Sequence, residues 1–176
     1  MELIGRMMDG SIPYDPGHQV EPVTSGPGAK QEDKIERLKD VPLFQGCSLR
    51  QLRSLARIAR IFDVSADTVL ARKGDPGHEF FLIMDGSARV EVSPDKRLLL
   101  RPGEFFGEMS MLDGSPRSAT VAADTPVRLL VISRQHFSDL LADVPGLTQT
   151  LLETLSRRVR QAEELVEQLR AASTGL

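Results

Sequence analysis

The stretch PGEFFGEMSMLDGSPRSATV, from Pro102 to Val121, is the most informative part of this 176-residue sequence. It predicts the end of a strand, a glycine, a short helical turn, a loop and the start of another strand. Gly107 allows the backbone to approach a ligand closely, and the turn after it directs unsatisfied N–H groups outward, which suits an anion. Arg117, at the start of the next strand, offers a guanidinium that can bind the same anion through two parallel hydrogen bonds.

Glu108 lies beside this predicted anion site. A carboxylate there is unfavourable unless the ligand also carries hydroxyl donors, and a phosphate attached to a sugar supplies both groups. Two alternatives give these residues structural roles only. Arg117 could form an ion pair with Asp113 or Glu108, and Glu108 could merely cap its own short helix.

Short apolar runs separated by turn residues surround this stretch. They cover residues 61–64, 68–71, 79–84, 88–92, 98–100, 119–123 and 127–132. Short strands at regular spacing with turns between them are typical of an antiparallel sandwich or barrel. Residues 88–92 alternate strictly between apolar and polar or small side chains, as a half-buried strand does. The sequence therefore predicts a β-domain over residues 61–133.

Helical patterns flank these strands. One begins near Gln31, and a second begins at Ser48, which has capping-box spacing to Gln51. After the last strand, a short helix is expected before Pro145 and a long one from Leu147 to about Ala172. Pro and Gly residues interrupt the beginning of the chain and predict a flexible arm. The predicted organisation is an arm over 1–30, helices over 31–60, the β-domain over 61–133 and C-terminal helices over 134–172.

The blocks Phe106–Ser110 and Pro116–Val121, at this separation and inside this strand pattern, resemble the phosphate-binding cassette of the cyclic nucleotide-binding domain family. The resemblance covers about Val41 to Leu169 and is closest to the sensor domain of catabolite activator proteins. It implies a mainly β fold with flanking helices: an eight-stranded antiparallel double-stranded β-helix, or jelly-roll β-roll, with the cassette at 105–121. We expect no helix-turn-helix, because the sequence stops at Leu176, a few residues past the long helix.

The resemblance also implies a role for each matching residue. Glu108 would accept hydrogen bonds from the ribose 2′-OH, Arg117 would pair with the exocyclic phosphate oxygens, and Gly107 would permit close approach. Backbone N–H groups of Ser110 and of Ser118 or Ala119 would complete the phosphate cradle. The expected ligand-binding residues are Phe106, Gly107, Glu108, Met109, Ser110, Arg117, Ser118 and Ala119.

The identity of the base is less constrained. A hydroxyl residue directly after the arginine, here Ser118, is common in cGMP-selective members of the family and also occurs in cAMP-responsive bacterial members. In the family the long C-terminal helix covers the base, and its adenine contacts would fall at Ala162 and Glu163. These two residues depart from the usual Thr-Ser pair. We expect cAMP as the first ligand and cGMP as the second.

The last helix carries a second pattern, an a/d heptad seam formed by Leu152, Leu155, Val159, Ala162, Val166 and Leu169. Such a seam suits a parallel two-stranded coiled coil, with Arg158 reaching Glu163 of a second copy. Alternatively the stripe packs on the chain's own β-roll, as we expect for Leu147 and Leu151. The basic run Arg157-Arg158-Val159-Arg160 lies among glutamates and predicts a solvated, salt-bridged face.

Composition limits the class of protein. The chain is 40% hydrophobic and 27% charged with a formal net charge of −3, which argues against a dedicated nucleic-acid binder. Cys47 is alone, and His18, His78 and His136 lack the spacing of a cupin-type metal site. No apolar run approaches the ~20 residues of a membrane span.

We therefore expect a cytoplasmic sensor without catalytic residues, metal or cofactor, which signals by rearranging its C-terminal helix towards a protein effector or a dimer mate. No DNA-binding domain and no membrane attachment are expected. Two alternatives remain open at this stage: a degenerate β-roll that acts as a protein-interaction module, and a receptor for another cyclic nucleotide or a cyclic dinucleotide.

Overall fold

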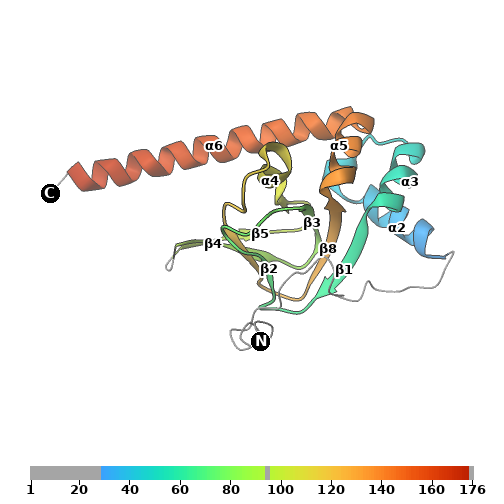
Figure 1. Ribbon diagram of the computed structural model, residues 1–176, viewed down its shortest axis with the longest axis horizontal. Helices are drawn as coiled ribbons and strands as arrows, with labels where there is room; N and C mark the ends of the chain where they lie inside the picture. The colour runs from blue at the N-terminus through green and yellow to red at the C-terminus, as the bar shows by residue number, and fades with distance from the viewer. Residues whose placement is uncertain (1–28, 94–95, 175–176) are drawn as a thin grey trace.

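The computed structural model describes residues 29–93 and 96–174. The predicted N-terminal arm therefore lies almost entirely outside the described residues. Within them, eight strands form two antiparallel four-stranded sheets with helices on either side in sequence (Figure 1). The strands are β1 (Arg60–Val64), β2 (Val69–Ala71), β3 (Glu79–Asp85), β4 (Ala88–Ser93), β5 (Lys96–Leu100), β6 (Phe105–Phe106), β7 (Thr120–Ala123) and β8 (Val127–Ser133). One sheet has the order β1-β8-β3-β6 and the other β2-β7-β4-β5. This arrangement confirms the predicted β-roll.

Strand β3 shows why the roll needs a continuous apolar run. Its side chains alternate between two hydrophobic clusters, because successive side chains of a strand point to opposite faces. Phe80 and Leu82 join the cluster under the helices, whereas Phe81 and Ile83 line the interior of the roll. A strand that is buried on both faces cannot show polar alternation. β3 therefore separates the hydrophobic cluster under the helices from the cluster inside the roll. Its first residue, Glu79, lies at the edge of the site described below.

The N-terminal helices are α2 (Ala29–Lys39), the short 3-10 helix η1 (Pro42–Phe44) and α3 (Leu49–Ile58). The predicted cap of α3 is confirmed. The Ser48 hydroxyl accepts a hydrogen bond from the Gln51 backbone N–H at 3.3 Å, and the Gln51 side chain accepts one from the Ser48 backbone N–H at 2.8 Å. This reciprocal pair satisfies two donors at the start of the helix and fixes where it begins.

The C-terminal helices are α5 (Arg134–Asp143) and α6 (Pro145–Thr174). Leu147 and Leu151 are buried in the cluster formed with the N-terminal helices, as predicted. Beyond them α6 runs past the short helix α4 (Glu108–Asp113) and extends away from the roll, ending at the C-terminal label of Figure 1. The first third of this helix is thus part of the core, and the remainder is largely exposed.

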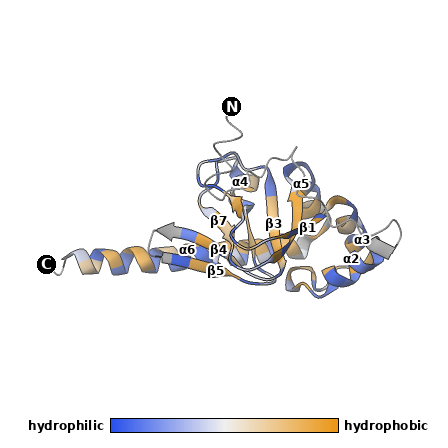
Figure 2. Ribbon diagram, turned by 90° about the horizontal axis from the view of Figure 1, so that it is seen from below, coloured by the Kyte–Doolittle hydropathy of each residue, from blue (hydrophilic) through white to orange (hydrophobic). Residues whose placement is uncertain are grey.

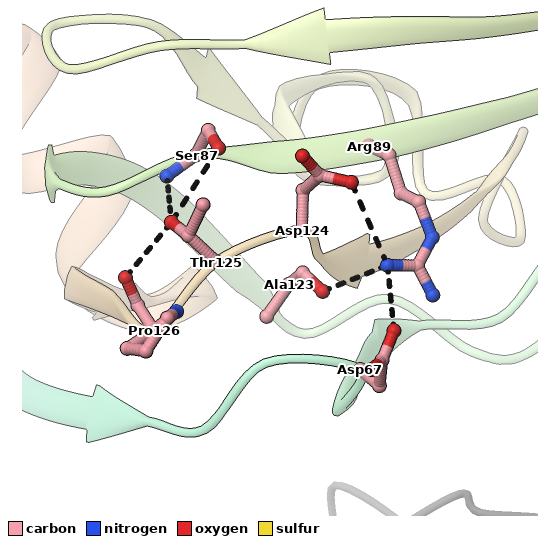
Figure 3. A network of polar contacts seen from close by, with 7 residues as sticks. All are labelled: Asp67, Ser87, Arg89, Ala123, Asp124, Thr125 and Pro126. Atoms are coloured by element: carbon pink, nitrogen blue, oxygen red, sulfur yellow. Dashed lines mark hydrogen bonds and ion pairs between the residues drawn. The ribbon is translucent and has the colours of Figure 1, made fainter.

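A polar network joins the turn that precedes β2 to the turn that follows β7 (Figure 3). The Arg89 guanidinium of β4 donates a hydrogen bond to the Ala123 carbonyl at 2.9 Å and lies 3.0 Å from Asp67 and 3.8 Å from Asp124. Asp67 precedes β2, and Asp124 follows β7. The network therefore holds in place the strand on which the predicted phosphate-binding cassette ends.

Candidate functional site

The predicted cassette is one continuous structural unit: β6, a glycine, the helix α4 and the loop that leads to β7. Gly107 has φ +85° and forms the N-cap of α4. A Cβ atom at this position would lie 2.5 Å from an Arg117 guanidinium nitrogen and 2.7 Å from the Glu79 carbonyl oxygen. Both the backbone conformation and the available space therefore require glycine here.

Arg117 is buried, with 6% of its surface exposed. One guanidinium nitrogen donates a hydrogen bond to the Gly107 carbonyl at 3.3 Å, and the other lies 3.3 Å from a Glu79 carboxylate oxygen. The guanidinium carbon is 5.4 Å from the centre of the Phe81 ring. The arginine is thus held in one orientation by three elements: β3, the residue before α4 and its own loop.

The loop between β2 and β3 fixes the backbone of Arg117. The Gly74 N–H donates to the Arg117 carbonyl, and the Arg117 N–H donates to the Asp75 carbonyl, both at 2.8 Å. A Cβ atom at Gly77 in the same loop would overlap the Ser110 side chain and lie 3.1 Å from the guanidinium carbon of Arg117. At Gly77 this loop therefore packs against the cassette without room for a side chain. Nothing in the sequence pattern distinguished this glycine from the other turn glycines.

Glu79 is the second buried charge at the arginine. The sequence suggested Asp113 or Glu108 as an ion-pair partner for Arg117, whereas the structure pairs Arg117 with Glu79, the first residue of β3, and Glu108 with Arg158. Burial raises the pKa of the Glu79 carboxyl, and the Arg117 guanidinium opposes this shift without cancelling it. A carboxylate at the start of an apolar run was the available sequence signal for a buried, paired acid.

Glu108 has an arginine partner from a distant part of the chain. Its carboxylate is buried, with 2% of the residue exposed, and lies 2.6 Å from a guanidinium nitrogen of Arg158. The other Arg158 nitrogen donates a hydrogen bond to the Phe105 carbonyl at 2.6 Å, and the guanidinium carbon lies 5.1 Å from the Phe105 ring centre. The interpretation of the basic run in α6 as a solvated face is wrong for Arg158, which links α6 to the cassette.

The remaining predicted residues lie in three different environments. Phe106 and Ser110 are buried, and the Phe106 ring stacks on Phe81 with centroids 4.7 Å apart. The Ser118 hydroxyl donates to the Met109 sulfur at 3.6 Å, both residues being exposed, and Ala119 is half-buried. Ala162 and Glu163, the predicted base lid, lie exposed on α6, one turn beyond Arg158. The structure therefore brings the cassette residues together and leaves the predicted lid residues on the helix surface.

Two further observations concern the residues that the structure describes. Among them, no three His, Cys, Asp or Glu side chains are grouped so that they could hold a metal ion. None of the helices in this part of the chain combines the length and the apolar character needed to cross a membrane.

The two-sheet roll, the flanking helices and a cassette built on Gly107, Glu108 and Arg117 define a β-roll domain with a buried arginine at the start of its cassette helix. Residues 61–144 match the cyclic nucleotide-binding domain family. The chain belongs to this family.

Three known proteins illustrate the match. A cyclic nucleotide-gated potassium channel of Rhizobium etli is 39% identical over 118 residues, which cover 67% of this chain and 33% of the channel. A CRP-like cAMP-activated global transcriptional regulator of Mycobacterium tuberculosis is 28% identical over 72% of this chain and 58% of the regulator. The crystal structure of a cyclic nucleotide-binding domain from Methylobacillus flagellatus has a TM-score of 0.59 at 31% identity, covering 76% of this chain and 80% of that domain. This chain thus spans about a third of the channel and little more than half of the regulator.

Proposed function

We propose that this chain binds a purine 3′,5′-cyclic nucleotide, cAMP in preference to cGMP, and acts as a sensor rather than an enzyme. One observation carries the proposal: a buried guanidinium, Arg117, contacts the carbonyl of Gly107, the N-cap of α4, and a buried carboxylate, Glu108, follows Gly107 directly. A cyclic phosphodiester has one negative charge, which one guanidinium neutralises through paired hydrogen bonds. Its ribose hydroxyl can donate a further hydrogen bond to the Glu108 carboxylate, which is also paired with Arg158.

The presence of a cation, Arg117, and an anion, Glu108, in the same cassette favours a sugar phosphate over a free anion as the ligand. Inorganic phosphate carries no sugar hydroxyl for Glu108, and at neutral pH its second charge is repelled by that carboxylate. A cyclic nucleotide presents its anion and its hydroxyl on one rigid ring system, at a fixed separation. Arg117 and Glu108, held by the two ends of the same cassette, suit such a ligand.

Two observations bear on the base. The Mycobacterium tuberculosis relative is named as cAMP-activated, which supports cAMP as the first ligand. The Ser118 hydroxyl donates its proton to the Met109 sulfur, and its oxygen can accept a hydrogen bond from the amino group of guanine. For this reason cGMP remains the second ligand.

A thermal-shift titration of the purified chain tests this function. The ligands are cAMP, cGMP, a cyclic dinucleotide and, as a control, linear 5′-AMP. At a hundredfold excess over its dissociation constant a ligand adds about 2.7 kcal/mol of stability, which raises the Tm of a chain of this size by roughly 5–10 °C. We expect this shift with cAMP, a smaller one with cGMP and none with 5′-AMP. A shift only with the dinucleotide would replace the ligand, and no shift with any of them would refute the function.

The proposed signal leaves through α6, because Arg158 of that helix holds the carboxylate that the ribose needs. A ribose hydroxyl at Glu108 changes the environment of this ion pair and so biases how α6 packs against the roll. Ala162 and Glu163 would reach the base only if this part of α6 moves towards it. Hydrogen exchange of residues 158–174 should therefore change on addition of cAMP. The change should be smaller in Arg158→Met, which keeps the apolar stem and removes the charge.

A second copy of the chain is the proposed partner of the exposed part of α6. Leu152, Val159, Val166 and Leu169 are exposed, and Figure 2 shows hydrophobic and hydrophilic bands alternating along this helix. A parallel coiled coil would bury these positions. Sedimentation should show a dimer at high micromolar concentration, and Val159→Glu should abolish it while Gln161→Glu should not. A wild-type chain that remains monomeric would direct the signal to a protein effector instead.

A further inference from the structure

Glu79 is a buried charge at the anion site that neither phosphate nor ribose binding uses. Its side chain is 11% exposed and that of Arg117 is 6% exposed, with 3.3 Å between the carboxylate oxygen and the guanidinium nitrogen. The main chain of Glu79 is also close to the site, since a Cβ atom at Gly107 would lie 2.7 Å from its carbonyl oxygen. The Glu79 carboxylate therefore lies next to the position that a phosphate bound by Arg117 would take.

A phosphodiester at Arg117 creates a conflict of charges. The guanidinium would then face two anions in a place with little access to water, and repulsion between anions is stronger there than in solvent. The phosphodiester is too strong an acid to take a proton near neutral pH, whereas a carboxyl group is able to do so. Once protonated, the Glu79 carboxyl gains an O–H donor that can point at a phosphate oxygen.

We propose that Glu79 is the internal counter-ion of Arg117 and that phosphate binding is coupled to the uptake of one proton from solvent by the Glu79 carboxylate. The charges balance in both states. In the free site Arg117 (+1) and Glu79 (−1) sum to zero, and in the occupied site Arg117 (+1), neutral Glu79 and the phosphodiester (−1) again sum to zero. Burial of Glu79 already raises the pKa of its carboxyl in the free protein, which places the group closer to neutral pH. This inference rests on the proposed function.

Other ionisable groups lie on the elements around the start of β3. Asp75 and the exposed His78 precede it in the chain. Arg134, whose backbone N–H donates to the His78 carbonyl, and His136 lie on α5, after β8. The paired Glu108 and Arg158 lie on α4 and α6. Arginines stay charged throughout the useful pH range. Besides the carboxylates, histidine is the side chain of this set that can bind a proton reversibly. His78, next to Glu79 in the chain, is therefore the group that a test must separate from Glu79.

Isothermal titration calorimetry of the full chain with cAMP, in two buffers with different enthalpies of ionisation, measures the protons taken up on binding. Uptake of one full proton changes Kd roughly tenfold per pH unit. For the wild type we expect uptake of about 0.3–1 proton between pH 6 and 8 and a Kd that weakens at least threefold over this range. Glu79→Gln should bind without proton uptake, with a Kd constant within about twofold, and more tightly than the wild type at pH 8.

Two control variants test the assignment to Glu79. His78→Gln and the distant surface change Glu32→Gln should both keep the wild-type proton uptake. Wild-type binding without proton uptake, a measurement that needs no variant, would overturn the inference and leave the proposed function standing. Proton uptake retained in Glu79→Gln but lost in His78→Gln would also overturn it. A wild-type chain that binds no cyclic nucleotide would instead refute the proposed function itself.

Discussion

Arg117→Ala tests the proposed ligand scheme at its central residue. In the structure this arginine has two hydrogen-bonding contacts of 3.3 Å, to the Gly107 carbonyl and to the Glu79 carboxylate. In the proposed complex the guanidinium would instead donate two charge-assisted hydrogen bonds to the ligand phosphate. Such bonds contribute about 1.5–3 kcal/mol each, or roughly 3–6 kcal/mol together.

Part of this energy is offset, because the guanidinium gives up its existing partners and Glu79 is placed next to a second anion. The expected net loss on removal of the side chain therefore lies in the lower part of this range, at about 3 kcal/mol, which corresponds to an affinity for cAMP that is ~100-fold weaker. The same substitution leaves Glu79 buried without this cation. Breaking a buried pair in this way destabilises a protein by up to ~3–5 kcal/mol, so the single variant loses both stability and affinity.

A second variant separates the two effects. Arg117→Ala combined with Glu79→Gln removes both charges, and we expect it to recover most of the lost Tm while its affinity for cAMP stays ~100-fold below that of the wild type. Calorimetry measures the affinity and a thermal melt the stability. Arg101→Ala, which removes an exposed arginine from the turn before β6, is the matched control and should change neither. A double variant that melts like the wild type and binds cAMP within threefold of it would refute the role of Arg117.

Three further predictions concern the packing and the charges of the roll. Gly77→Ala should weaken cAMP binding at least ~10-fold, because its methyl group would overlap Ser110 and press on Arg117, and calorimetry measures the loss. Without ligand, the unfolding free energy of the wild type should fall relative to that of Glu79→Gln as the pH rises from 5 to 8. The pKa of Glu79 is higher in the folded than in the unfolded state, so this carboxyl stabilises the fold at low pH, and the contribution is lost as the pH rises through the folded-state pKa. Denaturant curves at each pH measure the difference. Asp63→Asn should lower the unfolding free energy by about 1 kcal/mol or less at pH 7 and leave it unchanged near pH 2. Hydrogen bonds from Arg128 lower the pKa of Asp63 in the folded state, and their contribution to stability is lost as the pH falls through that pKa. Denaturant curves at both pH values check this.

Each of these predictions has a result that would contradict it. Gly146→Ala, at a position where a Cβ meets no atom within 4 Å, is the control for Gly77, and equal affinities of the two variants would contradict the steric argument. A stability difference between wild type and Glu79→Gln that does not vary with pH would mean that this carboxyl has an ordinary pKa. A cost of Asp63→Asn that persists at pH 2 would assign its effect to packing.

The parts of the fold that sequence predicts are those encoded by neighbouring residues. The capping box at Ser48 uses two residues three positions apart, and strand runs such as Glu79–Met84 are visible as apolar blocks. The order of features in the cassette, strand end, glycine, helical turn, loop and strand start, is also local and is confirmed. Strand β6 is different: it has only two residues, too few to show a period, and exists because Phe105 and Phe106 pair with β3.

The two acid–base pairs of the site could not be predicted because each joins distant parts of the chain. Glu79 precedes Arg117 by 38 positions, and Arg158 follows Glu108 by 50. No local pattern distinguishes Arg158 from Arg157 or Arg160. What selects it is its rotational position on α6, which is set by the burial of Leu147 and Leu151 several turns earlier. Anchoring of the helix start thus determines which arginine faces the cassette.

The two ion pairs connect the cassette to two separate elements. Arg117 and Glu79 join the cassette to β3, whereas Glu108 and Arg158 join it to α6, and the four charges sum to zero. In the proposed scheme the phosphate acts on the first pair and the ribose on the second. Since the phosphate and the ribose belong to one rigid ring system, an intact ligand would act on both ion pairs at once. A fragment that carries only one of these groups would act on one pair, so the covalent link within the nucleotide is what couples the charge state of β3 to the position of α6.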